Sequence, residues 1–360
     1  MTTLSRKEQF AVLFPDAPAF RLRQFEEALF DLSLKAFSDV SNMSLVMREK
    51  LDAKIPWLSL HPVHVFESVK KDTYKAVVEF GDRTRVETVL MQNARGQWTV
   101  CVSSQVGCAM GCTFCATGSM GLTRNLLADE IVDQVRFWFA FLSERKTLGA
   151  VEGSDLAPLS LPTRISNIVF MGMGEPLANY DHVRETINQL LLHTNLGPTH
   201  ITVSTVGLLP MLRKILQDPQ WPAVRLAVSL HSAVSETRKA MMPSSFDAFL
   251  EDLVVWTGEY FEKHESRRRH LTFEYVMLSK VNDTEAHAEA LIRFARRVGK
   301  VRINLIPYNF TGSVYRDSLP ADFARFEDRL KEAGVVVTRR RTMGDDIAAA
   351  CGQLIVEEIR

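Results

Sequence analysis

The sequence predicts an α/β protein whose core is a parallel sheet of βαβ units, preceded by a small helical unit and a short antiparallel sheet. Beyond Cys101, six short apolar runs alternate with longer amphipathic segments, which is the pattern of βαβ units around a parallel sheet. The segment before residue 60 has helical periodicity, and the stretch from His64 to Val102 alternates as antiparallel strands do. At 360 residues, the chain can form one large core with a smaller appendage.

The N-terminal segment is expected to form helices. Phe20, Phe25, Leu29 and Leu32 fall near one helical face before Pro56, so we expect them to share a small core. The stretches TYKAVVEF, RVETVLM and WTVCVSS follow, and their β-branched alternation predicts a short antiparallel sheet that leads into the core.

The parallel core is expected from six apolar runs and the helices between them. The predicted strands are TVCVSS, ISNIVFMG, HITVSTVG, VRLAVSLH, LTFEYVML and VRINLIP. Three of the helix-like stretches are Ala128 to Leu142, Asp181 to His193 and Glu285 to Val298. Periodicity leaves open whether the sheet is flat or curled into a partial barrel, but either form places chemistry at the carboxyl ends of the strands. The stretch from Lys146 to Thr163, rich in Gly and Pro, is expected to be an exposed insertion loop.

Charge and hydropathy narrow the functional classes. The 43 basic and 43 acidic side chains cancel, so any polyanionic partner would have to be held by local patches. No apolar run approaches the roughly 18 residues of a membrane span, and the opening MTTLSRKEQF lacks the apolar stretch of a signal peptide. We therefore expect a cytoplasmic protein with no membrane association.

Three of the five cysteines are crowded into one short segment, GCAMGCTFCATG, as Cys108, Cys112 and Cys115. Three thiolates in a tight loop can hold three irons of a [4Fe-4S] cube and leave the fourth iron open to another ligand. A structural zinc site is the first alternative, but it requires four ligands, and no second Cys/His pair at zinc spacing lies nearby. A ferredoxin-type carrier normally has a C-x2-C-x2-C run and a fourth cysteine, which this spacing does not match.

The C-x3-C-x2-C spacing, with Phe114 before the last cysteine, resembles the signature of radical SAM enzymes. Further blocks resemble one family within that class: FMGMGEP, STVG, LAVSLH, FEYVML, NLIPYN and GDDIAAACGQL. Together they resemble the RlmN/Cfr family of radical SAM RNA methyltransferases, which act on adenine ring carbons, and favour the RlmN-like branch. The resemblance implies a partial (β/α) barrel with a [4Fe-4S] cluster and S-adenosylmethionine (SAM). STVG in place of the usual STSG, and FTGSVY after NLIPYN, depart from the family pattern.

The resemblance implies four segments along the chain. Residues 1–62 are the expected N-terminal helical accessory domain, and residues 63–97 the expected β linker. Residues 98–330 correspond to the radical SAM partial barrel, and residues 331–360 to a C-terminal segment that carries a methyl-accepting cysteine.

The resemblance also assigns roles to the two remaining cysteines. Cys351 corresponds to a cysteine that one SAM molecule methylates, after which a second SAM is cleaved to a deoxyadenosyl radical that takes a hydrogen atom from this methyl group. The methylene radical then adds to the adenine carbon. A radical is needed because an electrophilic amidine carbon does not attack a sulfonium methyl group. Cys101 matches the thiol that opens the covalent adduct by forming a transient disulfide, and Glu87 matches the proposed general base.

Contacts to SAM can be assigned by motif within the same resemblance. Gly174 and Glu175 match the motif for the methionyl amine, since a carboxylate is a natural partner for an ammonium group. The remaining implied SAM contacts are Ser204, Ser229, Leu230, His231 and Asn309. Without the resemblance, Ser229 and His231 would be taken for an ordinary strand end.

Possible RNA contacts are the basic runs Ser266 to His270 and Thr338 to Thr342, together with Arg21, Arg23 and Arg124. Such runs are more often solvated faces, but the second run immediately precedes the segment carrying Cys351. The target adenine would have to leave its stack to meet Cys351.

The expected activity is methylation of adenosine carbon 2 in 23S rRNA, with tRNA as a second candidate substrate. The implied partners are RNA and a one-electron reductant such as flavodoxin, and we expect a monomer. Three alternatives remain at this point: carbon 8 methylation of the Cfr type, a radical SAM enzyme acting on a substrate other than RNA, and a catalytically silent RNA-binding protein with structural zinc.

Overall fold

The computed structural model describes residues 4–149, 164–264, 271–299 and 301–355. Most of the expected insertion from Lys146 to Thr163, and the whole basic run from Ser266 to His270, lie outside the described residues. Within the described part of the chain, no helix combines the length and apolar character needed to cross a membrane.

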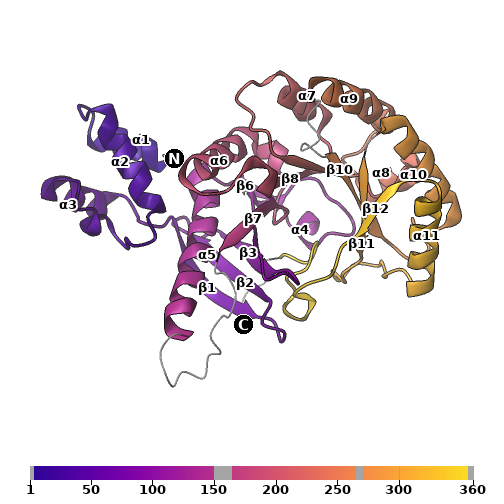
Figure 1. Ribbon diagram of the computed structural model, residues 1–360, viewed down its shortest axis with the longest axis horizontal. Coiled ribbons are helices and arrows are strands. Elements are labelled where there is room, and N and C mark those ends of the chain that lie inside the picture. The colour runs from indigo at the N-terminus through magenta and orange to yellow at the C-terminus, as the bar shows by residue number, and fades with distance from the viewer. Residues whose placement is uncertain (1–3, 150–163, 265–270, 300, 356–360) are drawn as a thin grey trace.

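A curved sheet of ten strands forms the centre of the molecule (Figure 1). In sheet order the strands are β1 (Leu60–Glu67), β2 (Thr73–Phe80), β3 (Arg85–Gln92), β4 (Trp98–Cys101), β7 (Ile165–Phe170), β8 (Ile201–Thr205), β9 (Arg225–Ser229), β10 (Leu271–Met277), β11 (Arg302–Pro307) and β12 (Val336–Arg339). Strands β1 to β4 pair antiparallel, whereas β4 to β12 pair parallel throughout. The parallel part does not close on itself, so the predicted α/β fold with a partial barrel is confirmed.

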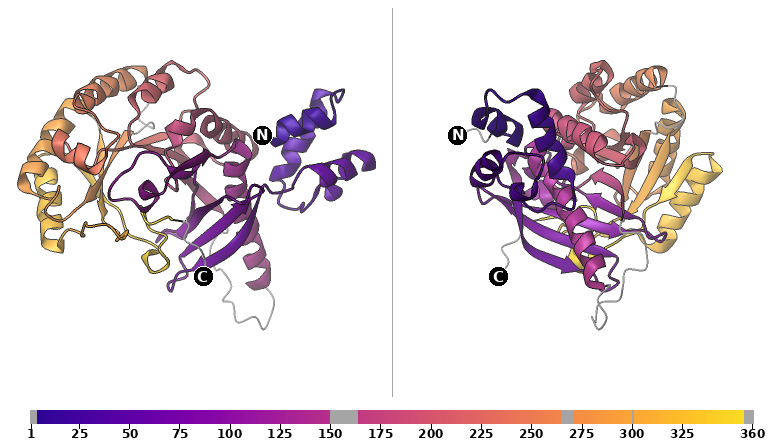
Figure 2. Two further views of the ribbon diagram at one scale, coloured as in Figure 1. Left: turned by 180° about the vertical axis from the view of Figure 1, so that it is seen from behind. Right: turned by 60° about the vertical axis from the view of Figure 1, so that its left-hand side comes forward.

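Helices cover the outer, convex side of the curved sheet and leave its inner side for the site (Figures 1 and 2). They are α5 (Ala128–Gly149), α6 (Tyr180–His193), α7 (Leu209–Gln217), α8 (Ser235–Met241), α9 (Phe249–Lys263), α10 (Glu285–Val298) and α11 (Pro320–Glu332). In α10 the buried Ala288, Leu291, Ile292 and Ala295 follow helical spacing, which is why this segment packs as an amphipathic helix. Gly299 ends it with a φ of 85°, a conformation that glycine adopts readily.

Strand β12 and helix α5 are among the elements that differ from the sequence predictions. The strand β12 was not predicted, because it has four residues and all of them are at least partly exposed. The helix α5 runs past the predicted end at Leu142 to Gly149, so Lys146–Gly149 is helical and not part of a loop.

The N-terminal helices α1 (Arg6–Leu13), α2 (Ala19–Phe30) and α3 (Leu45–Lys54) surround a small core of their own. Phe25 and Leu29 are buried in it as predicted. The predicted burial of Phe20 and Leu32 is wrong, since they are 49% and 52% exposed. Leu32 follows the end of α2, and the core is completed from other segments, by Phe10, Phe37 and Leu51 among others.

A buried ion cluster fastens this helical unit to the barrel. Asp133 of α5 receives Arg6 Nη2 at 2.8 Å and Arg136 Nη1 at 2.5 Å on one carboxylate oxygen. Its other oxygen accepts from the backbone N–H of Ser59 at 2.6 Å. Both arginines also donate to the carbonyl of Trp57. Burial alone would raise the pKa of Asp133, but the two guanidinium groups hold it below its ordinary value of 3.8.

We expect Asp133→Asn to lower the free energy of unfolding by about 3–5 kcal/mol, because it removes the carboxylate that two buried cations share and leaves Arg6 only the more distant Asp129, at 3.6 Å. The depressed pKa of Asp133 means that its stabilisation is complete above pH 3.8 and is lost as the pH falls through the folded-state pKa. Acid denaturation would measure both effects. The control is Asp181→Asn. Asp181 lies on the exposed side of α6 and pairs with Lys214, and losing this surface ion pair should cost at most about 1 kcal/mol. Equal costs for the two variants would contradict a fastening role.

Candidate active site

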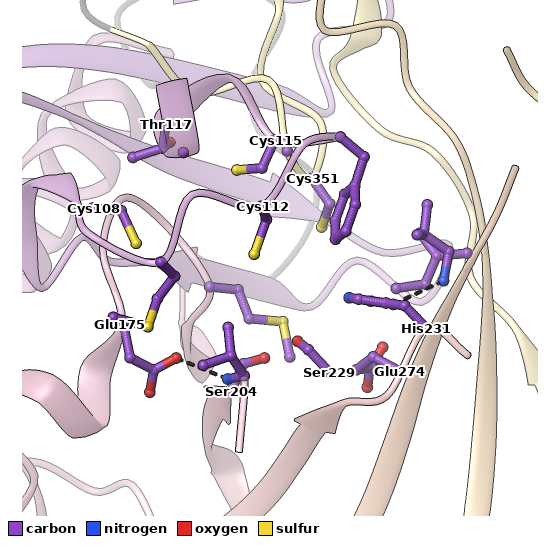
Figure 3. Close-up of a pocket in the computed structure, with 18 of the residues that line it drawn as sticks. Cys108, Cys112, Cys115, Thr117, Glu175, Ser204, Ser229, His231, Glu274 and Cys351 are labelled. Carbon is purple, nitrogen blue, oxygen red and sulfur yellow. Dashed lines mark hydrogen bonds between the residues drawn. The ribbon is translucent and has the colours of Figure 1, made fainter. Parts of the chain in front are cut away.

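The three clustered cysteines lie on one loop between a hairpin strand and a short helix. Cys108 ends β5 (Gln105–Cys108), which pairs with β6 (Gly121–Asn125) in a separate two-stranded sheet. Cys115 is the residue before α4 (Ala116–Ser119). The loop folds tightly on itself, since a Cβ at Gly118 would lie 2.7 Å from the Cys112 carbonyl oxygen. Figure 3 shows the three sulfur atoms pointing into one shared space.

The chemistry of these thiols fits an iron-sulfur cluster better than a single ion. Burial raises the pKa of Cys108 to about 11 and raises the pKa values of Cys112 and Cys115 as well. The thiols therefore need a strong cationic centre to become thiolates at neutral pH. Among the described residues, no three His, Cys, Asp or Glu side chains are placed to hold one metal ion. A four-iron cube binds its thiolates at separate corners, so Cys108, Cys112 and Cys115 suit it without converging on one point.

A cavity of about 990 Å³, including its open mouth, adjoins this loop. Its walls come from the carboxyl ends of the parallel strands, as the fold class predicts. Of the residues assigned to SAM from the sequence, the cavity is lined by Gly174, Glu175, Ser204, Ser229 and His231. The cavity thus brings the cysteine loop and most of the predicted SAM contacts to one place.

Glu175 offers a buried carboxylate in this cavity. Its Oε1 accepts from the N–H of Leu177 at 3.0 Å, and its Oε2 accepts from the N–H of Val206 at 2.8 Å. Gly174 before it has a φ of 98°, and a Cβ there would lie 2.5 Å from Gln105 Cβ, so glycine is required for this approach. Burial raises the pKa of Glu175 to about 7, and a bound ammonium group would favour its ionised form.

The segment from Ser229 to His231 is divided between the cavity and the core. His231 has a φ of 56°, and its Nδ1 accepts from the N–H of Val276 at 3.0 Å. Burial lowers the pKa of His231 to about 3, so the ring is neutral and its Nε2 carries the proton. Figure 3 shows this ring extending into the cavity. The side chain of Leu230, in contrast, is fully buried in the hydrophobic core and does not line the cavity.

Cys101 and Cys351 meet in a second, adjoining cavity. Cys101 ends β4, where burial raises the pKa of its thiol to about 12, with a further contribution from Cys351. Cys351 lines both cavities. Asn309 lies here rather than in the first cavity, and its Nδ2 donates to the Cys351 carbonyl at 3.1 Å. The structure therefore connects Asn309 with the C-terminal segment.

The C-terminal segment is bound directly to the cysteine loop. The N–H of Ala116 donates to the Gly352 carbonyl at 2.8 Å, and the Thr117 hydroxyl donates to the Leu354 carbonyl at 2.6 Å. These bonds hold Cys351 between the loop and β4, although the three segments are far apart in the sequence.

Glu87 lies on β3, two residues from Val89, which pairs with Cys101. Its Oε1 is 2.9 Å from Lys75 Nζ, and its Oε2 accepts from the N–H of Ile355 at 3.0 Å. It is 2% exposed and lines neither cavity. In this conformation, Ile355 covers Glu87.

Sequence reasoning missed one polar pair in the site. Glu274 of β10 lines the first cavity, and Arg340, from the run Thr338 to Thr342, lines both cavities. Arg340 Nη1 is 3.6 Å from Glu274 Oε2. In the sequence, Glu274 could have been noticed as the single acidic residue in the apolar strand LTFEYVM.

The basic residues considered for RNA have different surroundings. Arg124 is held by Glu130 at 2.8 Å and by Asp82 at 2.6 Å, so its charge is already neutralised. Arg21 donates to the carbonyl of Asn42, whereas Arg23 and Arg341 are exposed. Among the described candidates, Arg340 and Arg341 line the second cavity together with Cys351.

Comparisons with known proteins all identify this chain as similar to radical SAM proteins. The model of the radical SAM superfamily matches residues 102–295. The dual-specificity RNA methyltransferase RlmN of Syntrophobacter fumaroxidans is 36% identical over 344 residues, which cover 94% of this chain and 92% of that protein. The ribosomal RNA large subunit methyltransferase N of Nitrosopumilus maritimus is 36% identical over 330 residues, covering 89% and 88% of the two chains. The crystal structure of a radical SAM methyltransferase from Sphaerobacter thermophilus, 35% identical, superposes with a TM-score of 0.83 and covers 97% of this chain and 96% of that chain.

Replacing Thr117 by Val removes the hydroxyl that binds the Leu354 carbonyl and keeps the side-chain shape. We expect amide hydrogen exchange in the peptide containing Cys351 to accelerate roughly fivefold, the effect of about 1 kcal/mol. Removing the metal by chelation should also accelerate hydrogen exchange in this peptide, because the cysteine loop that binds the C-terminal segment loses its cluster. Thr257→Val, which removes a hydroxyl bonded to Leu253 within α9, is the matched control. Unchanged exchange in Thr117→Val would show that the loop does not hold the segment.

Proposed function

The chain belongs to the RlmN family of radical SAM RNA methyltransferases, and from this premise we propose that it methylates carbon 2 of an adenosine in 23S rRNA, with tRNA as a second substrate. It is a SAM-dependent enzyme with a [4Fe-4S] cluster. The names of the relatives from Syntrophobacter fumaroxidans and Nitrosopumilus maritimus support the RNA substrate. Methylation at carbon 8 is the outcome that product analysis would distinguish.

One observation carries the proposal: Cys351 lines both the cavity of the cysteine loop and the cavity of Cys101. A radical SAM enzyme that acts directly on a small molecule needs the first cavity alone. A thiol shared between the two cavities suits a reaction in which the methyl group is carried on the protein. Cys101 beside it provides the second sulfur that such a route requires.

The cluster and a bound SAM together supply a 5'-deoxyadenosyl radical, which is the hydrogen-atom acceptor for a methyl group on Cys351. Two SAM molecules are consumed in each turnover, one as methyl donor and one as radical source. Cys108, Cys112 and Cys115 would hold the cluster, and Glu175 would orient SAM through its ammonium group. Ser204, Ser229 and the neutral His231 offer further hydrogen-bonding groups in the same cavity.

Cys351 presents its methyl carbon to the target adenine, and the new carbon–carbon bond joins RNA to protein. Radical addition leaves one unpaired electron on the adduct, so release requires loss of both this electron, which the oxidised cluster would accept, and the proton on the adenine carbon. We assign that proton to Glu87. Cys101 then attacks the Cys351 sulfur and breaks its bond to the transferred carbon, which takes up a proton to become the methyl group, so that the two cysteines end as a disulfide. Glu87 is covered by Ile355, and this role therefore requires the end of the C-terminal segment to move.

The enzyme also needs a source of electrons and a cellular location. Reductive cleavage of SAM and reduction of the disulfide both need electrons, and we assign a one-electron reductant such as flavodoxin to the first step. We also propose that the enzyme acts in the cytoplasm, which the proposed ribosomal RNA substrate supports, and that it acts as a monomer.

Cys351→Ala tests the protein-borne methyl group. The variant should keep its iron and inorganic sulfide, because Cys351 is not among the proposed cluster ligands, and should lose RNA methylation completely. Metal and sulfide analysis after anaerobic purification, with a methyl-transfer assay on 23S rRNA, would measure both properties. Retained methylation in a cluster-loaded variant would sink the proposed mechanism.

Cys101→Ala tests the resolving thiol. The variant should still form the adduct but release it slowly, so that RNA stays covalently attached to Cys351. Denaturing gel electrophoresis under reducing conditions would detect the attached species, and the wild-type enzyme serves as the control. Normal turnover without an accumulated adduct would mean that Cys101 does not resolve it.

A further inference from the structure

A buried carboxylate oxygen in the first cavity has no hydrogen-bond partner among the described residues. Glu274 is 3% exposed, and its Oε1 accepts from Asn304 Nδ2 at 2.7 Å. Its Oε2 is buried without such a bond. A buried acceptor left in this way is costly, which makes a ligand donor the natural explanation. Figure 3 shows Glu274 beside Ser229 on the cavity wall, in agreement with their pairing across β9 and β10.

A cation lies next to this oxygen without satisfying it. Arg340 Nη1 is 3.6 Å from Glu274 Oε2, too far for a hydrogen bond. The same nitrogen donates to the thioether of Met171 at 3.4 Å, which is a weak acceptor. The side chain of Glu274 is held by Asn304, and the backbone N–H of Arg340 donates to the Leu305 carbonyl at 2.8 Å. Together they place an acceptor beside a donor.

This pair selects a ligand that carries a donor beside an acceptor. A ribose diol offers two hydroxyls and does not require the arginine, and the SAM carboxylate would be repelled by Glu274. Adenine presents an amino group at position 6 next to the acceptor N1, whereas guanine presents an oxygen at position 6 next to an N–H. The pair therefore accepts adenine and rejects guanine. The adenine of SAM presents the same edge and is the competing occupant, which a measurement of SAM affinity distinguishes from the RNA base.

We propose that Glu274 and Arg340 form the recognition site for the target adenine, with Glu274 accepting from the 6-amino group and Arg340 donating to N1. Arg340 also lines the cavity of Cys101 and Cys351, and carbon 2 is the ring atom adjacent to N1. Binding by this edge brings carbon 2 toward Cys351, and a hydrogen bond to N1 makes that carbon more electrophilic. Binding by the N7 edge would bring carbon 8 there instead. The inference rests on the proposed function and adds the substrate recognition to it.

The test combines one protein variant with one RNA change. The variant is Glu274→Gln, and the RNA is a short 23S rRNA fragment whose target adenosine is replaced by purine riboside, which lacks the 6-amino group. In the wild-type enzyme, this replacement should lower kcat/KM for methylation about 10- to 100-fold, the usual effect of losing a charged hydrogen bond. In Glu274→Gln, the side-chain amide is expected to keep its oxygen on Asn304 Nδ2 and to turn its NH2 group toward the 6-amino group, so the same replacement should cost less than about threefold.

Three further measurements complete the design. Equilibrium dialysis should give the same SAM affinity for Glu274→Gln and wild type, and the RNA with 7-deazaadenosine at the target should be methylated normally. Asp218→Asn, which removes a carboxylate between α6 and α7, is the control and should keep the full wild-type response to purine riboside.

Equal losses from purine riboside in the two enzymes would overturn the proposal, and so would weakened SAM binding in Glu274→Gln, which would assign Glu274 to SAM. Loss of activity on 7-deazaadenosine would contradict binding through N1. Failure of the wild-type enzyme to methylate the unmodified fragment would contradict the proposed function itself.

Discussion

The docking of the C-terminal segment on the cysteine loop is the contact on which the rest of the site depends. The bonds from Ala116 to Gly352 and from Thr117 to Leu354 bring Cys351 between the loop and β4. Without them the parallel barrel would still offer a cluster loop and a cavity at its strand ends, but the second pair of sulfur atoms would not meet. A barrel that remains open on one side leaves room for this segment, and a closed barrel would exclude it.

The electrostatics of the site follow from its burial. Burial raises the pKa values of Cys101 and Glu175 to about 12 and about 7 and lowers that of His231 to about 3, so these groups tend toward their neutral forms. The charged groups of the site would be those of the cluster and of SAM, and the side chains around them are largely neutral before these groups bind. Arg340 is the exception, because the neighbouring Cys351 and the carboxylate of Glu274 raise its pKa further and keep it cationic. This fixed positive charge beside two thiols is consistent with sulfur chemistry at that end of the cavity.

Much of the fold could be predicted because parallel strands buried on both faces appear as apolar runs. Strand β12 could not, since its residues are partly exposed and resemble a loop. Phe20 and Leu32 were placed in the N-terminal core by periodicity alone, whereas the real core takes Phe10 and Phe37 from separate segments. The cysteine loop could be found from spacing, and Cys351 with Cys101 from resemblance. Their proximity, the association of Asn309 with Cys351, and the pair of Glu274 and Arg340 depend on long-range packing that no local pattern contains.

Peptide mass spectrometry of the protein isolated with its cluster and exposed to SAM tests most directly whether Cys351 carries the methyl group. We expect the peptide containing Cys351 to carry one methyl group on sulfur and the peptide containing Cys101 to be unmodified. An unmodified Cys351 in cluster-loaded protein that has met SAM would contradict a protein-borne methyl group and would leave the two adjoining cavities without a shared function.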